Sequence, residues 1–304
     1  MIRLLTSFIF ILIIVSCESY NSNFQKKLNN AEPYKELSSQ DLYKEESDFS
    51  IIKYILEDPY YIDGVLYIPE EDYQYSEVGL ASFYERELHN IKTINNDFNK
   101  VTELLGRHKT LPLPSIVKIT NLENGMFLTI KIIDRHNDNA TLVQVSRKTA
   151  QLLRFYKNKI TRVKVEIIKD ASKQLKVVTK SMSDPIFFDT IDKAPTDKIT
   201  ILEIDNEEET DISNLKKVKF IERPVEIGTE EVSIKELYLK IYDFKTLNEA
   251  KNAISGPNSS YSNNIVNIDE SFAIIFGPLS NLEAKNLVLS FISKGYKKTK
   301  FILK

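Results

Sequence analysis

The chain has 304 residues, with 41 Lys and Arg against 43 Asp and Glu and a formal net charge of -2. This length is enough for two domains of ordinary size. Acidic and basic residues are interspersed, so the basic footprint of a nucleic-acid-binding protein is absent and we expect no nucleic-acid partner. The three histidines lack the spacing of metal ligands and no free cysteine accompanies them, so we expect no metal site and no other cofactor.

The N-terminus is typical of a lipoprotein signal peptide. Arg3 precedes an apolar run over residues 4–15 that is too short to span a bilayer comfortably, and residues 14–17 (IVSC) fit a lipobox. We therefore expect a signal peptide over residues 1–16 and lipid attachment, of the diacylglyceryl or palmitate kind, at Cys17. The alternative is an uncleaved membrane anchor, and both alternatives place the rest of the chain outside the cytoplasm.

Residues 17–57 are mostly polar and show no apolar periodicity. Such a composition favours a flexible tether. Some thirty flexible residues have a root-mean-square reach on the order of 30 Å and a stretched reach near ~100 Å. This is enough to hold a folded domain away from the membrane.

Residues 58–169 are predicted to form a β domain. Apolar and polar residues alternate, as in half-buried strands, in SIVKIT, FLTIKII, TLVQVS and TRVKVEII, which start at Ser115, Phe127, Thr141 and Thr161. Residues 123–125 form a turn signal between the first two, which indicates a hairpin. A short helix is predicted from Ser146. Many short strands with little helix favour a small closed barrel.

Residues 170–235 carry a weaker signal and are predicted to be a linker. The acidic run DNEEETD at 205–211 is typical of a solvated segment. Residues 175–180 and 198–204 could add stray strands.

Residues 236–304 contain an internal repeat. IYDFKTLNEAKNAI, from Ile241, aligns over fourteen positions with IFGPLSNLEAKNLV, from Ile275. Each copy predicts a strand, a turn and the start of a helix. A duplicated unit of this kind, followed by a last strand at KTKFIL, predicts a ferredoxin-like βαββαβ domain.

The candidate site residues are two acids and a histidine, Asp97, His108 and Asp134. A carboxyl pair with a polar partner is what cleavage of a glycosidic bond requires, since one group must donate a proton while charge develops at the sugar carbon. Each residue also has a structural alternative. Asp97 could belong to an Asx turn, His108 could be a packed side chain, and Asp134 could pair with Arg135.

The stretch from 79 to 150 resembles the rare lipoprotein A (RlpA) family of peptidoglycan lytic transglycosylases. That family shows the phrases G-x-A-S-W-Y-G, T-A-N-G-E, A-A-H-x-T-L-P and V-x-V-T-N-L-x-N-G, followed by N-D-R-G-P. The matching residues here are Gly79, Ala81, Ser82, Tyr84, Thr93, Asn95, His108, Thr110, Leu111, Pro112, Asn121, Leu122, Asn124, Gly125, Asp134 and Arg135. From Thr93 to His108 the pattern fits without a gap, and Asp97 stands where the family has glutamate.

The resemblance implies a double-psi β-barrel that cleaves the MurNAc–GlcNAc bonds of peptidoglycan strands lacking stem peptides, with formation of 1,6-anhydroMurNAc. It makes Asp97 the acid and base. His108 positions the sugar or tunes the acid, and Asp134 stabilises developing charge. Phe83, Tyr84 and Arg135 are the predicted substrate-binding residues.

Residues 272–296 resemble the second half of a SPOR domain, a module that binds peptidoglycan strands at sites of division. The two resemblances together imply a lipid-anchored protein of the cell envelope that faces peptidoglycan and works in wall remodelling or septation, with divisome proteins as further partners. The alternative is a non-catalytic peptidoglycan-binding lipoprotein on the same scaffold.

Overall fold

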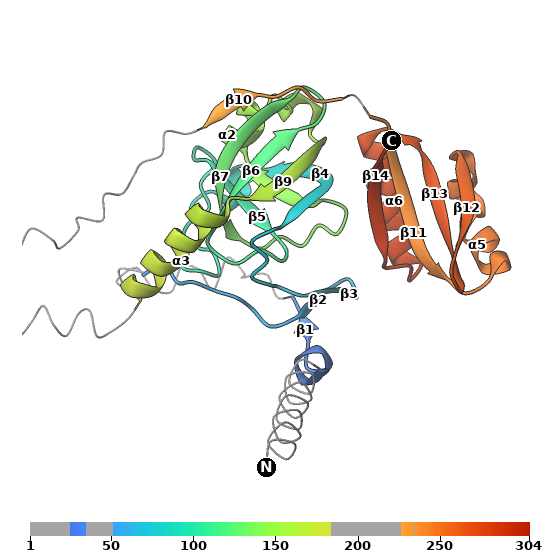
Figure 1. The fold of residues 1–304 in the computed structure, drawn as a ribbon, viewed down its shortest axis with the longest axis horizontal. Helices are drawn as coiled ribbons and strands as arrows, with labels where there is room; N and C mark the ends of the chain where they lie inside the picture. Colours follow the sequence, from blue (N-terminus) through green and yellow to red (C-terminus); the bar gives the residue numbers. More distant parts are fainter. Residues whose placement is uncertain (1–24, 35–50, 184–225, 234) are drawn as a thin grey trace, which may run out of the picture.

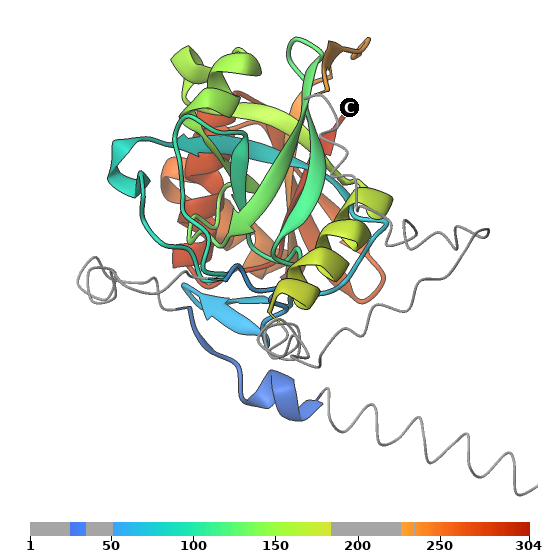
Figure 2. The ribbon, with the colours of Figure 1, turned by 90° about the vertical axis from the view of Figure 1, so that its left-hand side faces the viewer.

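The computed structural model describes residues 25–34, 51–183, 226–233 and 235–304 (Figure 1). A β-barrel and a C-terminal α/β domain lie side by side, and Figure 2 shows the barrel in front of the second domain. The predicted signal peptide, Cys17 and the acidic run at 205–211 lie outside the described residues. Within the described ranges, none of the helices is long and apolar enough to cross a membrane.

Six strands close the barrel. They run in the order β7-β5-β8-β4-β9-β6, and β6 pairs back onto β7. The β4–β8 and β5–β7 pairs are parallel and the other four pairs are antiparallel. This arrangement is consistent with a double-psi barrel and confirms the predicted fold class. The strands are β4 (Ser76–Tyr84), β5 (Leu105–His108), β6 (Ser115–Asn121), β7 (Met126–Asp134), β8 (Val143–Ser146) and β9 (Thr161–Ile167).

The alternating residues predicted from the sequence fill the barrel. Val117 and Ile119 of β6, for example, have no exposed surface and lie in one apolar cluster with residues of β7, β8 and β9. The predicted hairpin joins β6 to β7, and Gly125 takes a φ of 72° there, a conformation that favours glycine. Ser146 caps α2 (Arg147–Leu152) as predicted. Two short 3-10 helices lie in the connections, η1 (Arg86–Leu88) between β4 and β5 and η2 (Tyr156–Asn158) between α2 and β9.

The start of the predicted linker is instead a helix, α3 (Lys169–Met182), packed on β6. The Ser172 hydroxyl accepts from the Ile116 N–H at 2.9 Å and donates to the Ile116 carbonyl at 3.1 Å. Ser172 and Thr179 are buried, seven residues apart on one face. The strand predicted at residues 175–180 is wrong, because these residues belong to α3 and Val177 is 67% exposed.

The end of the predicted tether contacts the barrel. Ile55 exchanges backbone hydrogen bonds of 2.7 and 3.0 Å with Leu113. Further upstream, β1 (Glu32–Pro33) pairs with a hairpin of β2 (Tyr60–Ile62) and β3 (Val65–Tyr67). The predicted domain boundary at residue 58 therefore lies inside the structured part of the chain.

The C-terminal domain has the predicted ferredoxin-like order. Its antiparallel sheet runs β12-β13-β11-β14. The two copies of the sequence repeat form equivalent structures. Thr246 and Ser280 occupy equivalent positions, and each caps its helix by accepting from the backbone N–H of the glutamate three residues further on. The elements are β11 (Leu237–Phe244), α5 (Leu247–Ile254), η4 (Gly256–Ser260), β12 (Asn263–Ile268), β13 (Ser271–Leu279), α6 (Asn281–Ser293) and β14 (Thr299–Leu303).

A short strap, β10 (Ile227–Thr229), leads from the barrel into the second domain. It pairs antiparallel with residues 126–128 of β7. The Glu230 carboxylate then accepts from the Lys118 ammonium at 2.5 Å and from the Thr120 hydroxyl at 2.8 Å. The strap is therefore fixed on the barrel by both its backbone and a side chain.

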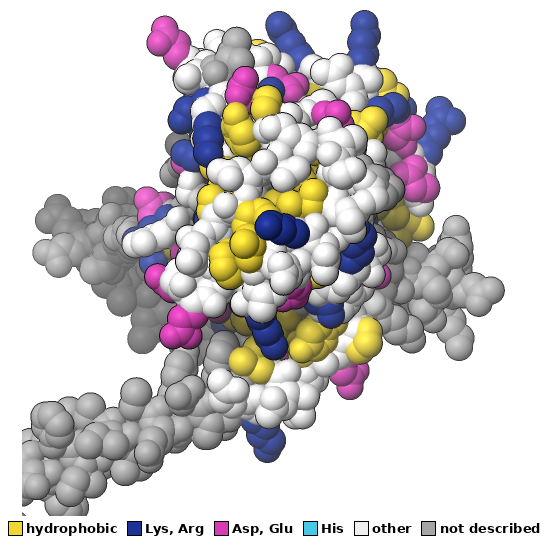
Figure 3. All heavy atoms as spheres, turned by 90° about the vertical axis from the view of Figure 1, so that its right-hand side faces the viewer, with side chains coloured by type: hydrophobic (Ala, Val, Ile, Leu, Met, Phe, Trp, Pro, Cys, Tyr) yellow, Lys and Arg dark blue, Asp and Glu magenta, His cyan; other side chains and the backbone are white. Residues whose placement is uncertain are grey.

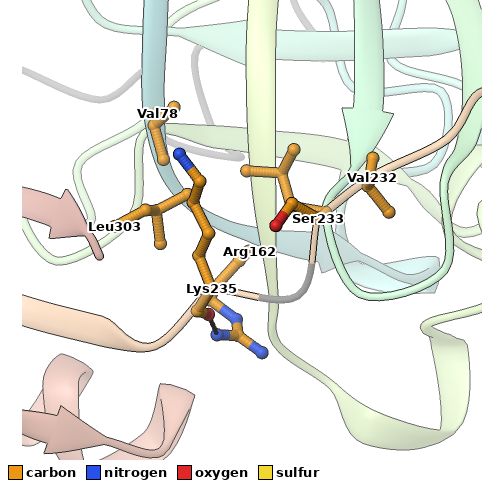
Figure 4. Close-up of a pocket in the computed structure, with 7 residues that line it drawn as sticks. Val78, Arg162, Val232, Ser233, Lys235 and Leu303 are labelled. Carbon is orange, nitrogen blue, oxygen red and sulfur yellow. Dashed lines mark hydrogen bonds between the residues drawn. The ribbon is translucent and has the colours of Figure 1, made fainter.

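The second domain contacts the barrel through α6. Asn281 donates to the Glu123 carboxylate at 2.6 Å, and Lys285 binds the Asp138 carboxylate at 2.7 Å. Beside the strap lies a cavity of about 170 Å³, crossed at its edge by a 2.7 Å hydrogen bond from Arg162 to the Lys235 carbonyl (Figure 4). Its lining residues are Val78, Leu122, Arg162, Val232, Ser233, Lys235 and Leu303.

We expect Gly125→Ala to lower the free energy of unfolding by about 1–3 kcal/mol, because the backbone there has a positive φ. An added Cβ would also lie 2.1 Å from the Glu230 carbonyl oxygen. Urea denaturation of the full chain measures the loss. Gly256→Ala is the matched control, since Gly256 has a φ of 79° with nothing within 4 Å of an added Cβ. Equal losses for the two variants would contradict the clash with the strap.

Candidate functional site

A β-bulge between β5 and β7 decides which face of the barrel wall carries the acids. Gly106 lies opposite Ile132 and Arg107 lies opposite Asp134, so β7 contains one extra residue, Ile133. A Cβ on Gly106 would meet the side chains of Ile130 and Ile132. The next residue, Arg107, therefore points to the other side of the wall. Because an extra residue inverts the alternation that follows it, Asp134 shares that outer face.

Asp134 is held there by three donors. Its Oδ2 accepts from Arg107 Nε at 3.2 Å and from Asn99 Nδ2 at 2.9 Å, and its Oδ1 accepts from the Ile94 N–H at 3.4 Å. The two side chains of the ion pair are only 5% and 7% exposed. Arg107 also donates to Gln144 at 2.8 Å. Asp134 thus binds the loop of residues 93–99 to the outer face of β7.

Asp97 ends a tight turn in that same loop. The Asn95 side chain accepts from the Asp97 N–H at 3.2 Å, and the Thr93 N–H donates to the Asp97 carbonyl at 2.8 Å. Asn96 has a φ of 66°, a conformation that asparagine tolerates well, which explains how it stands where the RlpA phrase has glycine. The Asx turn considered as an alternative is therefore present, and it presents the Asp97 side chain.

The Asp97 carboxylate binds Lys131 of β7. Its Oδ2 accepts from Lys131 Nζ at 2.7 Å and its Oδ1 from the Phe98 N–H at 2.8 Å. The Asp97 side chain is 16% exposed and the Lys131 side chain 32%. Since Lys131 precedes the bulge and alternates with Ile130 and Ile132, it also lies on the outer face. The structure thus brings both predicted acids to one face.

His108 lies on the opposite face of β5. It is paired with Val143 of β8, a fully buried core residue, and cross-strand partners share a face. Its Nδ1 accepts from the N–H groups of Thr110 and Leu111, both at 3.2 Å, and its Nε2 lies 2.9 Å from the Tyr75 hydroxyl. Burial, together with the nearby cations Lys109 and Arg135, lowers the pKa of His108 well below its ordinary value. His108 is therefore neutral near pH 7, and with Nδ1 accepting it carries its proton on Nε2.

Two of the three predicted substrate-binding residues have no exposed surface. Tyr84 is fully buried, and so is Arg135, whose Nε binds Glu57 at 2.6 Å. Arg135 Nη1 donates to the carbonyls of His108 at 2.9 Å and Leu111 at 2.6 Å. Arg135 pairs with Glu57 and not with Asp134, and it joins the upstream segment to the loop after β5.

Phe83 differs from these two residues because it is only partly buried. Its ring centroid lies 5.0 Å from that of Tyr156 and 6.0 Å from that of Phe155. Lys159 Nζ lies 5.1 Å from the centre of the Phe83 ring. The rings of Phe83 and Tyr156, with the Lys159 ammonium group, form an aromatic and cationic surface at the carboxyl end of β4, and the buried Phe155 ring supports it.

Sequence reasoning missed Arg107, Lys131 and Phe98 at this site. Arg107 and Lys131 bind the two acids, and Phe98 is 40% exposed beside Asp97. The available signal was that Arg107 and Lys131 stand directly before His108 and three residues before Asp134. Among the residues that the structure describes, no three His, Cys, Asp or Glu side chains gather in a way that could hold a metal ion.

We expect the free energy of unfolding to fall as the pH drops below about 6.5, the ordinary pKa of histidine in the unfolded chain. The folded-state pKa of His108 is lowered, so the unfolded chain binds more protons in this range and stability rises with pH. In His108→Gln the slope of stability against pH should be smaller, by at most about 1.4 kcal/mol per pH unit. Urea denaturation between pH 7 and pH 5 measures both slopes, and identical slopes would contradict a buried neutral His108.

No protein-family model matches this chain. Curated relatives do. The chain is 30% identical over 199 residues to a protein named endolytic peptidoglycan transglycosylase RlpA from Rickettsia typhi, which covers 62% of this chain and 61% of the relative. It is 33% identical over 170 residues to the protein of that name from Rickettsia felis, covering 53% of this chain and 71% of the relative.

A protein of the same name from Pseudomonas aeruginosa is 36% identical over 112 residues, which is 36% of this chain and 32% of the relative. The chain spans 61% of the length of the R. typhi relative and 51% of that from Rickettsia prowazekii. The identity and coverage, above all with the R. felis protein, together with the closed six-stranded barrel, show that this chain belongs to the RlpA family.

Proposed function

We propose that this protein is a peptidoglycan lytic transglycosylase that cleaves the MurNAc–GlcNAc bonds of strands lacking stem peptides. The observation that carries the proposal is the placement of Asp97 and Asp134 on one outer face of the barrel. Family membership supports the same activity, since the relatives bear the name endolytic peptidoglycan transglycosylase.

Asp97 serves as acid and then as base. It donates a proton to the bridging oxygen, and the bond from that oxygen to the MurNAc anomeric carbon breaks as positive charge develops on the sugar ring. The C6 hydroxyl of the same MurNAc then attacks the anomeric carbon and returns a proton to Asp97. The products are a 1,6-anhydroMurNAc end and a free GlcNAc hydroxyl, and no water is consumed.

Asp134 supports this chemistry by position and charge. It fixes the loop that presents Asp97, through Asn99 and the Ile94 N–H. Its carboxylate also adds negative charge beneath the reacting sugar, where a developing cation is stabilised. His108 acts through the barrel, as a positioning residue, because its neutral ring lies on the other face and fixes the Thr110 and Leu111 backbone.

The aromatic surface at Phe83 suits sugar stacking, since sugar rings present apolar faces to aromatic rings. We retain Phe83 as a substrate-binding residue. Tyr84 and Arg135 support the site from within, because neither reaches solvent.

The C-terminal domain is proposed as a SPOR-like module that binds peptidoglycan strands. Tyr238, Lys240 and Tyr242 alternate with buried residues along β11 and so point away from the helices. Lys304 and Lys240 lie 4.9 and 4.8 Å from the ring centres of Tyr238 and Tyr242. Figure 3 views the molecule from the right-hand side of Figure 1. It shows hydrophobic and basic side chains together near the middle of that face.

We place the protein in the cell envelope, held to a membrane by lipid on Cys17 and facing peptidoglycan, with divisome proteins as further partners. The lipobox motif supports the anchor, and the names of the relatives, peptidoglycan transglycosylases, support the location. The domain boundaries inferred from the sequence remain part of this proposal, apart from the changes that α3 and residues 51–57 require.

A second function is non-catalytic binding of glycan strands. The observation that favours it is that both acids already accept from cations, Asp97 from Lys131 and Asp134 from Arg107. A carboxylate held in this way binds a sugar hydroxyl without donating a proton.

We expect the purified full chain to release 1,6-anhydro ends from peptide-free glycan strands, measured by mass spectrometry. Asp97→Asn should lower the rate by about a hundredfold or more, since it removes the proton donor, and should leave the unfolding midpoint nearly unchanged. Asp134→Asn should lower both the rate and the stability, because it breaks a buried ion pair, at a cost of about 3–5 kcal/mol.

The matched control is Asp58→Asn, which breaks an exposed ion pair of 2.6 Å with Lys27 outside the site. It should leave the rate unchanged. If neither the unaltered chain nor Asp97→Glu releases anhydro ends, the enzymatic function is excluded and the binding function takes its place.

A further inference from the structure

We propose that Lys131 is a specificity and positioning residue that exchanges its carboxylate partner when substrate binds. In the free protein it holds Asp97. With substrate present it binds the lactyl carboxylate of a MurNAc residue. This inference rests on the proposed function and assigns a residue to the recognition of the substrate's charge.

The free-state contact makes such an exchange necessary. Lys131 Nζ lies 2.7 Å from Asp97 Oδ2. A carboxylate that accepts from an ammonium group cannot at the same time donate a proton to a glycosidic oxygen through that same atom. The ion pair between Lys131 and Asp97 must therefore break before Asp97 can act as an acid.

The substrate carries a group that can replace Asp97 in this ion pair. Removing a stem peptide from MurNAc converts an uncharged lactyl amide into a carboxylate, which places one negative charge on each disaccharide. A lysine binds such a carboxylate by a charge-assisted hydrogen bond. Asp97, released from Lys131, keeps its Oδ1 contact with the Phe98 N–H, and its Oδ2 is free to face the glycosidic oxygen.

Lys131 is well placed to make this contact, because it already binds the Asp97 carboxylate. Arg107 is 5% exposed and committed to Asp134 and Gln144. Lys100 binds Glu103 at 2.9 Å. Lys131 is 32% exposed and projects from the outer face of a rigid strand, so its long side chain reaches both Asp97 and a sugar beside it.

Phe98 completes the surface next to this pair. It is 40% exposed and follows Asp97 directly. A sugar ring stacked on Phe98 would set its lactyl group near the ammonium of Lys131. The turn thus presents an apolar face, an acid and a cation within a few residues of one another.

The test uses the full chain with ¹³C-labelled aspartate carboxyl groups, and the Asp97 resonance is assigned by its loss in Asp97→Asn. The probe is the GlcNAc–MurNAc disaccharide, which has no MurNAc–GlcNAc bond to cleave. It is used with a free lactyl carboxylate or as the lactyl amide. Binding at the second domain does not perturb a signal from Asp97, so the readout is local.

We expect the free acid to shift the Asp97 resonance and to bind about tenfold more tightly than the amide, as one charge-assisted hydrogen bond implies. Lys131→Gln should remove this preference and leave amide binding unchanged, whereas Lys131→Arg should keep it. Lys100→Gln is the control and should behave as the unaltered chain. Equal binding of acid and amide by the unaltered chain, or a preference that survives in Lys131→Gln, would overturn the proposal.

Cleavage of long strands separates this proposal from the proposed function. If the chain releases no anhydro ends but Lys131→Gln loses the preference for the acid, the protein binds glycan without cleaving it and Lys131 still recognises the lactyl carboxylate. If anhydro ends form and Lys131→Gln keeps both the preference and the KM of the unaltered chain, the activity stands and the role of Lys131 is excluded.

Discussion

One extra residue in β7 determines how this barrel carries its chemistry. If β7 alternated regularly through Ile133, the Asp134 carboxylate would point inward with Ile130 and Ile132. The bulge at Ile133 makes Asp134 face outward beside Arg107. The loop that bears Asp97 then has a fixed anchor, because its backbone and Asn99 both bind the Asp134 carboxylate. The register between β5 and β7 therefore determines which side chains meet at the site.

The strand register also explains why Asp97 and Asp134 lie on one face of the barrel wall and His108 on the other. Asp97 and Asp134 come together because both are reached from the outer face of β7. His108 follows Arg107 on β5 and so faces the interior with Val143. Its ring is used to hold backbone N–H groups. Three residues that form a series in the sequence thus act on two sides of one wall.

Much of the fold could be predicted from local pattern, and the parts that could not have physical reasons. Alternation identified β6, β7 and β9, and the turn at Gly125 identified their hairpin, because these signals are local. The helix α3 was missed because its two buried side chains, Ser172 and Thr179, are both polar and give no apolar periodicity. The face of Asp134 depends on a bulge between β5 and β7, and the contact of Lys131 with Asp97 joins residues that are 34 positions apart in the chain. Neither follows from spacing along the chain.

The strap β10 has a mechanical consequence for the whole molecule. Because its backbone extends the edge of β7 and Glu230 is bound by Lys118 and Thr120, the second domain is suspended from a fixed point only a few residues upstream of β11. The α6 contacts of Asn281 with Glu123 and of Lys285 with Asp138 hold the same domain at a second place. Two separate attachments resist rotation of one domain against the other, which a single attachment would allow.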